Sequence, residues 1–208
     1  MPLPDKRRVG VIGGTFDPIH FGHLAIAEEV YSQLDLAEVV FVPAGQPPHK
    51  MGEKISAARH RLAMLALAIA PNPHFSISQV DLQRIGPSYT VEMLRLLQAQ
   101  WGNQTAIYFI IGWDSLEELL TWHDPAGILE RLTFLVAVQR PGYQEASGYR
   151  EELEARLPTI TQRLLTVSAP QLEIASTDLR QRVAEGRPIT YQTPETVERY
   201  IAQHRLYR

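Results

Sequence analysis

The feature that most constrains this chain is the alternation of short apolar runs with segments of helical spacing. The apolar runs are rich in Val, Ile and aromatic residues, and several end at Gly or Pro. Such runs predict buried strands, and helical segments between consecutive strands predict βαβ units and a mainly parallel sheet. The sequence therefore predicts an α/β fold, with strands expected at residues 9–12, 39–42, 75–80, 105–111, 133–138 and 164–167.

Helix ends are predicted from the residues that favour them. The first expected helix begins near Pro18 or His20. Further helices are expected at residues 56–70, 90–99, 115–120, 176–184 and 194–204. Ser56 is the expected cap of the second helix. In the last helix Thr193 is the expected N-cap and Pro194 the first helical residue, a position that proline favours.

Length and composition favour one domain and disfavour several classes of protein. At 208 residues the chain suits a single domain over 1–208, with 176–208 as a closing helical segment. Its 20 Lys and Arg nearly balance 23 Asp and Glu, which argues against nucleic acid as a partner. There are no cysteines, so a thiol nucleophile and Cys-ligated zinc are excluded.

Targeting and membrane signals are weak in this sequence. The longest apolar run, 62–70, is far shorter than the ~20 residues of a membrane helix, and no signal-peptide pattern precedes the first strand. We therefore expect a cytoplasmic protein with no membrane partner.

Residues 13–29, GGTFDPIHFGHLAIAEE, follow the first strand, where the sheet of an α/β protein binds ligands. The segment lacks both the P-loop and the G-x-G-x-x-G pattern. His20 and His23 are three residues apart at a helix start, so both imidazoles are expected on one face of the first turn. A helix N-terminus favours anions, and imidazoles there can donate hydrogen bonds to phosphate oxygens. Gly22 leaves room for a ligand to approach the backbone.

Two alternatives exist for the histidines: a metal pair, or ordinary polar residues of a helix. No third ligand of suitable type lies nearby in the sequence, so no protein metal site is expected. The glycines and the Thr-Phe-Asp-Pro turn before them favour a phosphate site over ordinary helix residues.

The stretch GTFDPIHFGH resembles the first signature of the nucleotidylyltransferase superfamily. Six later motifs occur in order: FVPAGQPPHK, YTVEML, IGWDSLEELLTWHDPAGIL, VAVQRPG, IASTDLR and VERYIAQHRLY. Together they closely resemble the bacterial nicotinate-nucleotide adenylyltransferases, over nearly the whole chain. The resemblance implies a Rossmann-like, doubly wound sheet with helices on both faces. It also implies adenylyl transfer from ATP, used with Mg²⁺, to nicotinate mononucleotide, giving deamido-NAD and pyrophosphate in NAD biosynthesis.

The resemblance further implies roles for individual residues. The expected catalytic residues, which contact phosphates, are His20, His23, Lys50 and Arg180. The expected ATP-binding residues are Gly13, Gly14, Thr15, Phe16, Gly22, Arg140, Ser176 and Thr177. The expected mononucleotide-binding residues are Thr90, Asp114, Trp122 and His123.

Simpler interpretations compete with some of these roles. Lys50 taken alone suits a solvated loop, Ser176 suits a plain N-cap, and Trp122 suits core packing. Trp113 stands where the family usually has a smaller residue, so we expect it to reshape the wall of the substrate pocket.

Other functions also compete. The acceptor could instead be nicotinamide mononucleotide or pantetheine phosphate, and a non-catalytic nucleotide-binding protein on the same fold is an alternative of a different class. Whether the chain forms a homo-oligomer is left open.

Overall fold

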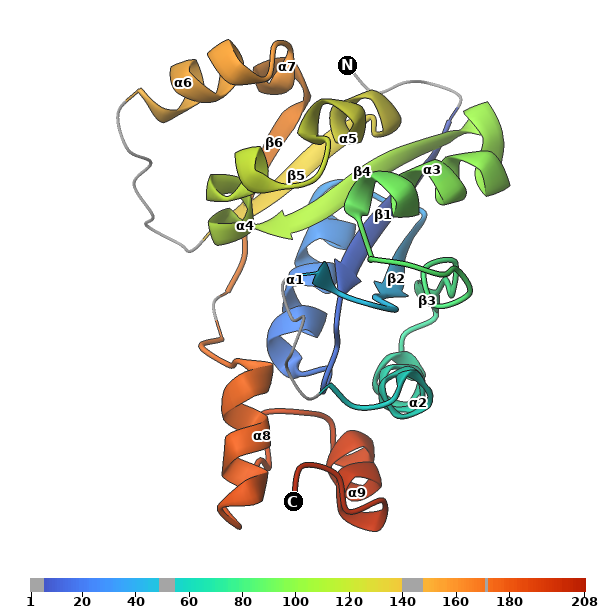
Figure 1. Cartoon of the computed structure of the whole chain (residues 1–208), viewed down its shortest axis with the longest axis vertical. Coiled ribbons are helices and arrows are strands. Elements are labelled where there is room, and N and C mark those ends of the chain that lie inside the picture. The colour runs from blue at the N-terminus through green and yellow to red at the C-terminus, as the bar shows by residue number, and fades with distance from the viewer. Residues whose placement is uncertain (1–5, 49–54, 140–147, 171) are drawn as a thin grey trace.

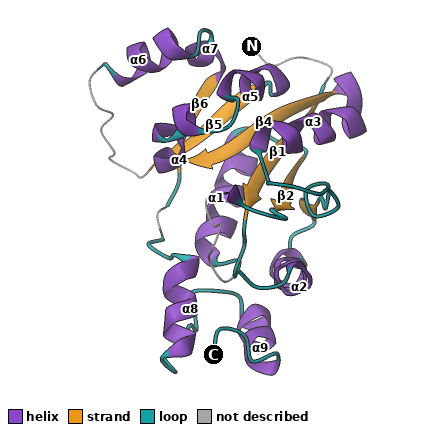
Figure 2. Ribbon diagram, viewed as in Figure 1, coloured by secondary structure: helices purple, strands orange, loops and turns teal. Residues whose placement is uncertain are grey.

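The structure is a computed structural model that describes residues 6–48, 55–139, 148–170 and 172–208. Its six strands form one sheet in the order β3-β2-β1-β4-β5-β6, and every strand pair is parallel (Figure 2). The strands are β1 (Arg7–Gly14), β2 (Glu38–Pro43), β3 (Phe75–Ile77), β4 (Thr105–Gly112), β5 (Phe134–Gln139) and β6 (Leu164–Ser168). The predicted α/β fold with a parallel, doubly wound sheet is confirmed.

Helices connect the strands and follow the last one. They are α1 (Phe21–Gln33), α2 (Ala58–Ile69), α3 (Thr90–Trp101), α4 (Trp113–Glu117), α5 (Pro125–Arg131), α6 (Tyr149–Arg156), α7 (Ile160–Arg163), α8 (Ser176–Ala184) and α9 (Glu195–Gln203). Two short 3₁₀ helices, η2 (Gly102–Gln104) and η3 (Leu119–Thr121), lie in the described residues as well. None of the helices in this part of the chain is long and apolar enough to cross a membrane.

Alternating side chains of the central strands build a core on each face of the sheet. In β4, Ile107 and Phe109 pack with the helices α3 to α7. Tyr108 and Ile110 point the other way and pack with α1, α2, α8 and α9. Successive side chains of a strand face opposite sides, so a strand covered on both faces must be apolar throughout, as β4 is.

Residues 176–208 close the second of these two faces. Leu179 of α8 and Val197 and Ile201 of α9 are buried in the same core as α1 and α2. Figure 1 shows α8 and α9 at the same end of the molecule as α2, with α6 and α7 at the opposite end. The division into one domain with a closing segment stays a prediction.

Two predicted helix caps are wrong. Helix α9 has Pro194 as its N-cap, and the Thr193 hydroxyl donates to the carbonyl of Ile19, 2.8 Å away. Helix α2 has Ala57 as its N-cap, while the backbone N–H of Ser56 donates to the Asp17 carboxylate. In both cases a residue that favours helix ends is used for a long-range contact instead.

Other element predictions need smaller corrections. The predicted strand at 75–80 is shorter, because β3 ends at Ile77. Helix α5 was not predicted, although Asp124 caps it by accepting a hydrogen bond from the N–H of Gly127 and Pro125 opens its first turn. The sequence also predicts a loop at 141–148, but this segment lies almost wholly outside the described residues.

The strand order places a ligand site between β1 and β4. The chain leaves β1 toward β2 and leaves β4 toward β5, so the connections diverge on either side of this pair. A crevice forms at the carboxyl ends of strands where the order reverses in this way. Both His20 and Asp114 follow this pair of strand ends.

Candidate active site

Two cavities lie beyond the carboxyl ends of β1 and β4, and they share His23, Ile26, Gly112 and Ser115. The first cavity, of about 310 Å³, lies on the side of β2 and α3. The second, of about 560 Å³, lies on the side of β5. The first is lined by residues that include Gly13, Gly14, Thr15, Thr90 and Trp122, and the second by residues that include His20, Gly22, Trp113, Asp114 and Leu172.

The two histidines stand together at the start of α1. Helix α1 has His20 as its N-cap and begins at Phe21, so His23 is in the first turn. The ring centroids of His20 and His23 are 3.7 Å apart, as the predicted shared face requires. Their rings therefore meet where the two cavities adjoin.

Burial sets the protonation state of His20. Its side chain is only 6% exposed, and this burial lowers its pKa from 6.5 to about 4. A buried charge without a partner is costly, so His20 is neutral near neutral pH. It can offer a hydrogen bond to a phosphate but not a positive charge.

The backbone orients the second histidine. The N–H of His20 donates to Nδ1 of His23 over 3.4 Å, so this nitrogen carries no proton. The proton of a neutral His23 ring is then on Nε2, the nitrogen at the far edge of the ring. The edge of Phe16 packs on the His23 ring, with centroids 5.2 Å apart.

Gly22 lies against the His20 ring and also lines the second cavity, whereas Phe16 supports the His23 ring from the protein interior. A Cβ atom on residue 22 would lie 3.0 Å from Nδ1 of His20, so a side chain there would crowd that ring. Phe16 is 1% exposed and does not line either cavity. Gly13, Gly14 and Thr15 do line the first cavity.

Three of the four predicted mononucleotide residues lie at or beside the first cavity. Thr90 is the first residue of α3, where free N–H groups are available, and it lines the cavity together with Trp122. Trp122 is half-buried and packs edge-on against Phe109 with ring centroids 6.4 Å apart. The exposed His123 stacks on Tyr89, the N-cap of α3, with centroids 4.1 Å apart.

Asp114 is not brought together with this group. It is exposed and lines the second cavity, on the other side of Gly112 and Ser115. Trp113 is 5% exposed and also lines the second cavity. It therefore shapes the wall of that cavity and not the wall of the cavity beside Thr90. A Cβ on Gly112 would lie 2.9 Å from an oxygen of Asp114, which explains the glycine before this carboxylate.

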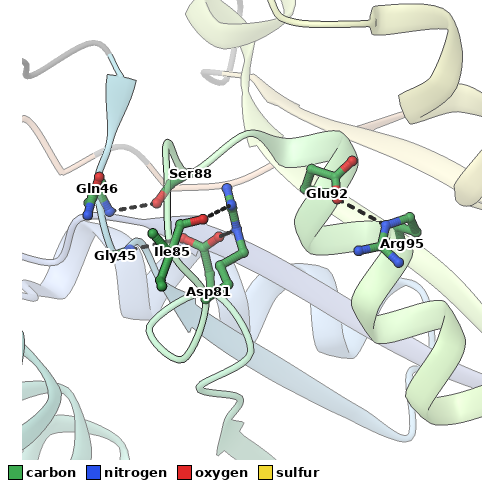
Figure 3. Close-up of polar contacts among 8 residues, drawn as sticks. Gly45, Gln46, Asp81, Ile85, Ser88, Glu92 and Arg95 are labelled. Carbon is green, nitrogen blue, oxygen red and sulfur yellow. Dashed lines mark hydrogen bonds and ion pairs between the residues drawn. The ribbon is translucent and has the colours of Figure 1, made fainter.

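Asp81 and Ser88, which the sequence analysis missed, line the first cavity and belong to a hydrogen-bonded group beside it (Figure 3). Asp81 is 3% exposed; one carboxylate oxygen accepts the N–H of Gly45 and the other accepts Nε of Arg84. Ser88 exchanges two hydrogen bonds with Gln46, through its hydroxyl and its N–H. These bonds join the loop after β2 to the loop that leads into α3. The sequence signal that could have revealed this group is the Asp81-x-x-Arg84 spacing, which suits an ion pair.

The predicted phosphate residues of α8 contact the loop that carries His20. The Ser176 hydroxyl donates to the carbonyl of Pro18, and Nη1 of Arg180 donates to the carbonyl of Asp17, each over 2.8 Å. Thr177 is exposed at the same helix start. Lys50 and Arg140 lie outside the described residues.

Comparisons with known proteins agree with this geometry. The cytidylyltransferase-like family model matches residues 11–182. A protein of Thermomicrobium roseum named probable nicotinate-nucleotide adenylyltransferase is 50% identical over 201 residues, 97% of this chain and 92% of that protein. One from Roseiflexus sp., with the same name, is 48% identical over 96% of this chain and 98% of its own length.

The chain belongs to the nicotinate-nucleotide adenylyltransferase family. As a member of this family it is a nucleotidyltransferase, which confirms the predicted enzyme class. A solved nicotinic acid mononucleotide adenylyltransferase of Plasmodium falciparum, complexed with NaAD, has a TM-score of 0.75 and 16% identity, and the match covers 97% of both chains. At that identity the likeness supports the nucleotidylyltransferase fold.

Lowering the pH is expected to destabilise the protein through His20. Unfolded chains protonate this histidine below pH 6.5, whereas the folded protein does so only near pH 4. The unfolded state therefore binds more protons in this range, and stability falls as the pH falls, by about 2 kcal/mol at about pH 5. Urea unfolding of the wild type and His20→Gln at neutral and acidic pH measures the effect. An equal loss in both proteins would exclude His20 as its source.

Proposed function

We propose that this chain joins ATP and nicotinate mononucleotide to give deamido-NAD and pyrophosphate. The observation that carries the proposal is the pair of cavities that meet at His23. A phosphate oxygen of the mononucleotide attacks the α-phosphorus of ATP, and the bond from that phosphorus to the pyrophosphate oxygen breaks. Two nucleotides bound on opposite sides of His23 have their reacting phosphates side by side, which supplies most of what such a transfer needs.

The mononucleotide is assigned to the first cavity and ATP to the second. The face of Trp122 offers a surface on which a pyridine ring can stack. Asp114 was expected to bind the mononucleotide, but its place in the second cavity favours the ribose hydroxyls of ATP. Leu172 and Ile174, in the same cavity, offer apolar contacts for adenine.

The histidines act as aimed hydrogen-bond donors. Charge develops on the α-phosphate and the leaving pyrophosphate as the bond breaks, and preorganised donors stabilise it. Neutral His20 and the Nε2–H of His23 serve this purpose, together with Gly13, Gly14 and Thr15 of the loop. Gly22 and Phe16 support them indirectly by fixing the ring positions.

Charge compensation for the triphosphate has other proposed sources. Nη1 of Arg180 donates to the carbonyl of Asp17, and the remaining guanidinium donors are assigned to the β- and γ-phosphates. Ser176 and Thr177, at the start of α8, and Lys50 and Arg140 keep their predicted phosphate contacts as proposals.

Magnesium is proposed to enter with ATP. Among the described residues no group of three or more His, Cys, Asp or Glu side chains could hold a metal ion. Mg²⁺ keeps several waters and binds through substrate phosphates, so the ATP phosphates suffice to carry it. ATP and the mononucleotide are the proposed partners, and a homo-oligomer stays a prediction.

His23→Ala is expected to lower kcat about 10²–10³-fold, because it removes a donor whose bond strengthens in the transition state. KM for ATP should change much less. Steady-state kinetics with both substrates measure the split, and His74→Ala is the control, since this exposed histidine stacks on Tyr31 away from both cavities. A raised KM with normal kcat would mean that His23 only docks ATP.

Trp122→Ala is expected to raise KM for the mononucleotide while binding of ATP stays nearly unchanged. Stacking of a base on an aromatic side chain contributes ~1–3 kcal/mol. The matched control is Trp101→Ala, which removes another half-buried tryptophan, at the far end of α3. If Trp122→Ala only lowers the melting temperature, as the control should, then Trp122 is a packing residue.

Nicotinate mononucleotide is expected to be strongly preferred over its amide. The N–H groups at the start of α3, near Thr90, and the backbone of His123 are proposed to bind both carboxylate oxygens, whereas a carboxamide would turn its NH₂ group toward a donor. Sites built on hydrogen bonds can discriminate by ~10⁴–10⁵ against such a ligand. The test is pyrophosphate release from ATP with nicotinate mononucleotide, nicotinamide mononucleotide and pantetheine phosphate in turn. Preference for another acceptor, or no release with any of them, would overturn the proposed function.

A further inference from the structure

Three consecutive carbonyl oxygens in the loop before His20 accept hydrogen bonds from side chains of the closing segment. Arg180 donates to Asp17, Ser176 to Pro18 and Thr193 to Ile19, each over 2.8 Å. The backbone N–H of Phe21 also donates to the carbonyl of Gln192 over 3.0 Å. The loop that presents the histidines is therefore held by residues that lie more than one hundred positions later in the sequence.

Asp17 is the most completely engaged residue of this loop. Its side chain is only 2% exposed. One carboxylate oxygen accepts the Tyr207 hydroxyl over 2.6 Å, and the other accepts the N–H of Ser56 over 2.9 Å. A buried carboxylate needs such donors, and removing one leaves an oxygen without its partner.

Arg61 fixes the other side of the loop. It is 1% exposed, and its guanidinium donates to the carbonyls of Thr15 and Ser56. Burial lowers the pKa of Arg61, and the charge of Asp17 opposes that effect. The Asp17 carboxylate thus compensates the buried positive charge of Arg61, and the Tyr207 hydroxyl holds the carboxylate in place.

We propose that Tyr207 and Thr193 are positioning residues for adenylyl transfer, which hold the loop of residues 15–20 so that His20 and His23 face the phosphates. Tyr207 suits this role because burial, followed by the charge of Asp17, raises its pKa, so the hydroxyl stays a donor. Only the expected effect on kcat rests on the proposed function; the holding of the loop does not.

Tyr207→Phe tests the proposal, because it removes one hydroxyl and keeps the ring. The matched control is Tyr200→Phe, which removes the hydroxyl that meets Nδ1 of His60 over 3.0 Å, on α9 and away from the loop. Thr193→Val removes an independent bond to the same loop and should act in the same direction. All three variants are compared with the wild type in full-length protein.

We expect Tyr207→Phe to lower kcat about tenfold with KM for the mononucleotide unchanged, since small displacements of catalytic groups cost up to ~10²-fold. Tyr200→Phe should keep kcat within about twofold. Hydrogen exchange followed by mass spectrometry should show faster exchange in peptides covering 13–24 for Tyr207→Phe and Thr193→Val only.

Two results would overturn the proposal. One is unchanged exchange in 13–24 for Tyr207→Phe, whatever its stability. The other is an equal loss of kcat in Tyr207→Phe and Tyr200→Phe, which would indicate a general effect of the closing segment. A wild type that releases no pyrophosphate would instead refute the proposed function, and the exchange experiment would still decide whether the loop is held in this way.

Discussion

The site depends on how one short loop satisfies its backbone carbonyls. The loop between β1 and α1 makes no strand or helix of its own over residues 15–20, so its polar groups need partners from elsewhere. Donors from α2 and from residues 176–208 supply them. Carbonyl oxygens that face a triphosphate would repel it. Once the carbonyls of Asp17, Pro18 and Ile19 are engaged by the closing segment, the loop can present imidazoles and N–H groups to the phosphates instead.

This anchoring also explains why the closing segment belongs to the site as well as to the core. Helices α8 and α9 bury Leu179 and Ile201 against the same face of the sheet that α1 covers. Packing brings α8 to the loop, and Ser176 and Arg180 then bond to it. The same helix start is where phosphates are proposed to bind, so on that proposal one helix both fixes the loop and binds ATP.

The sequence predicted most of what depends on local pattern and less of what depends on distant contacts. The strands, the helix at His20 and the meeting of His20 with His23 follow from periodicity and spacing, and the structure agrees. The predicted cap Thr193 failed because its hydroxyl is bound to the loop, 174 positions away, and Ser56 missed the cap position of α2 by one residue. Asp81 was missed because its partner Gly45 becomes a neighbour only when β2 and β3 pair and bring the loops after them together. The placement of Asp114 required knowing which side of β4 it faces.

The histidine pair itself shows that this site relies on positioned hydrogen-bond donors more than on fixed positive charge. With ring centroids 3.7 Å apart, two imidazolium rings would repel each other strongly. Burial removes that conflict by keeping His20 neutral, since its pKa is about 4. Because Nδ1 of His23 also accepts the N–H of His20, the pair offers hydrogen-bond donors to a phosphate rather than two positive charges. Neutralising a triphosphate therefore requires cations from other elements, and Arg180 is one of those we propose. A chain with net charge −3 can accept a polyanion on these terms, because the proposed attraction is local to the site and does not need a basic surface.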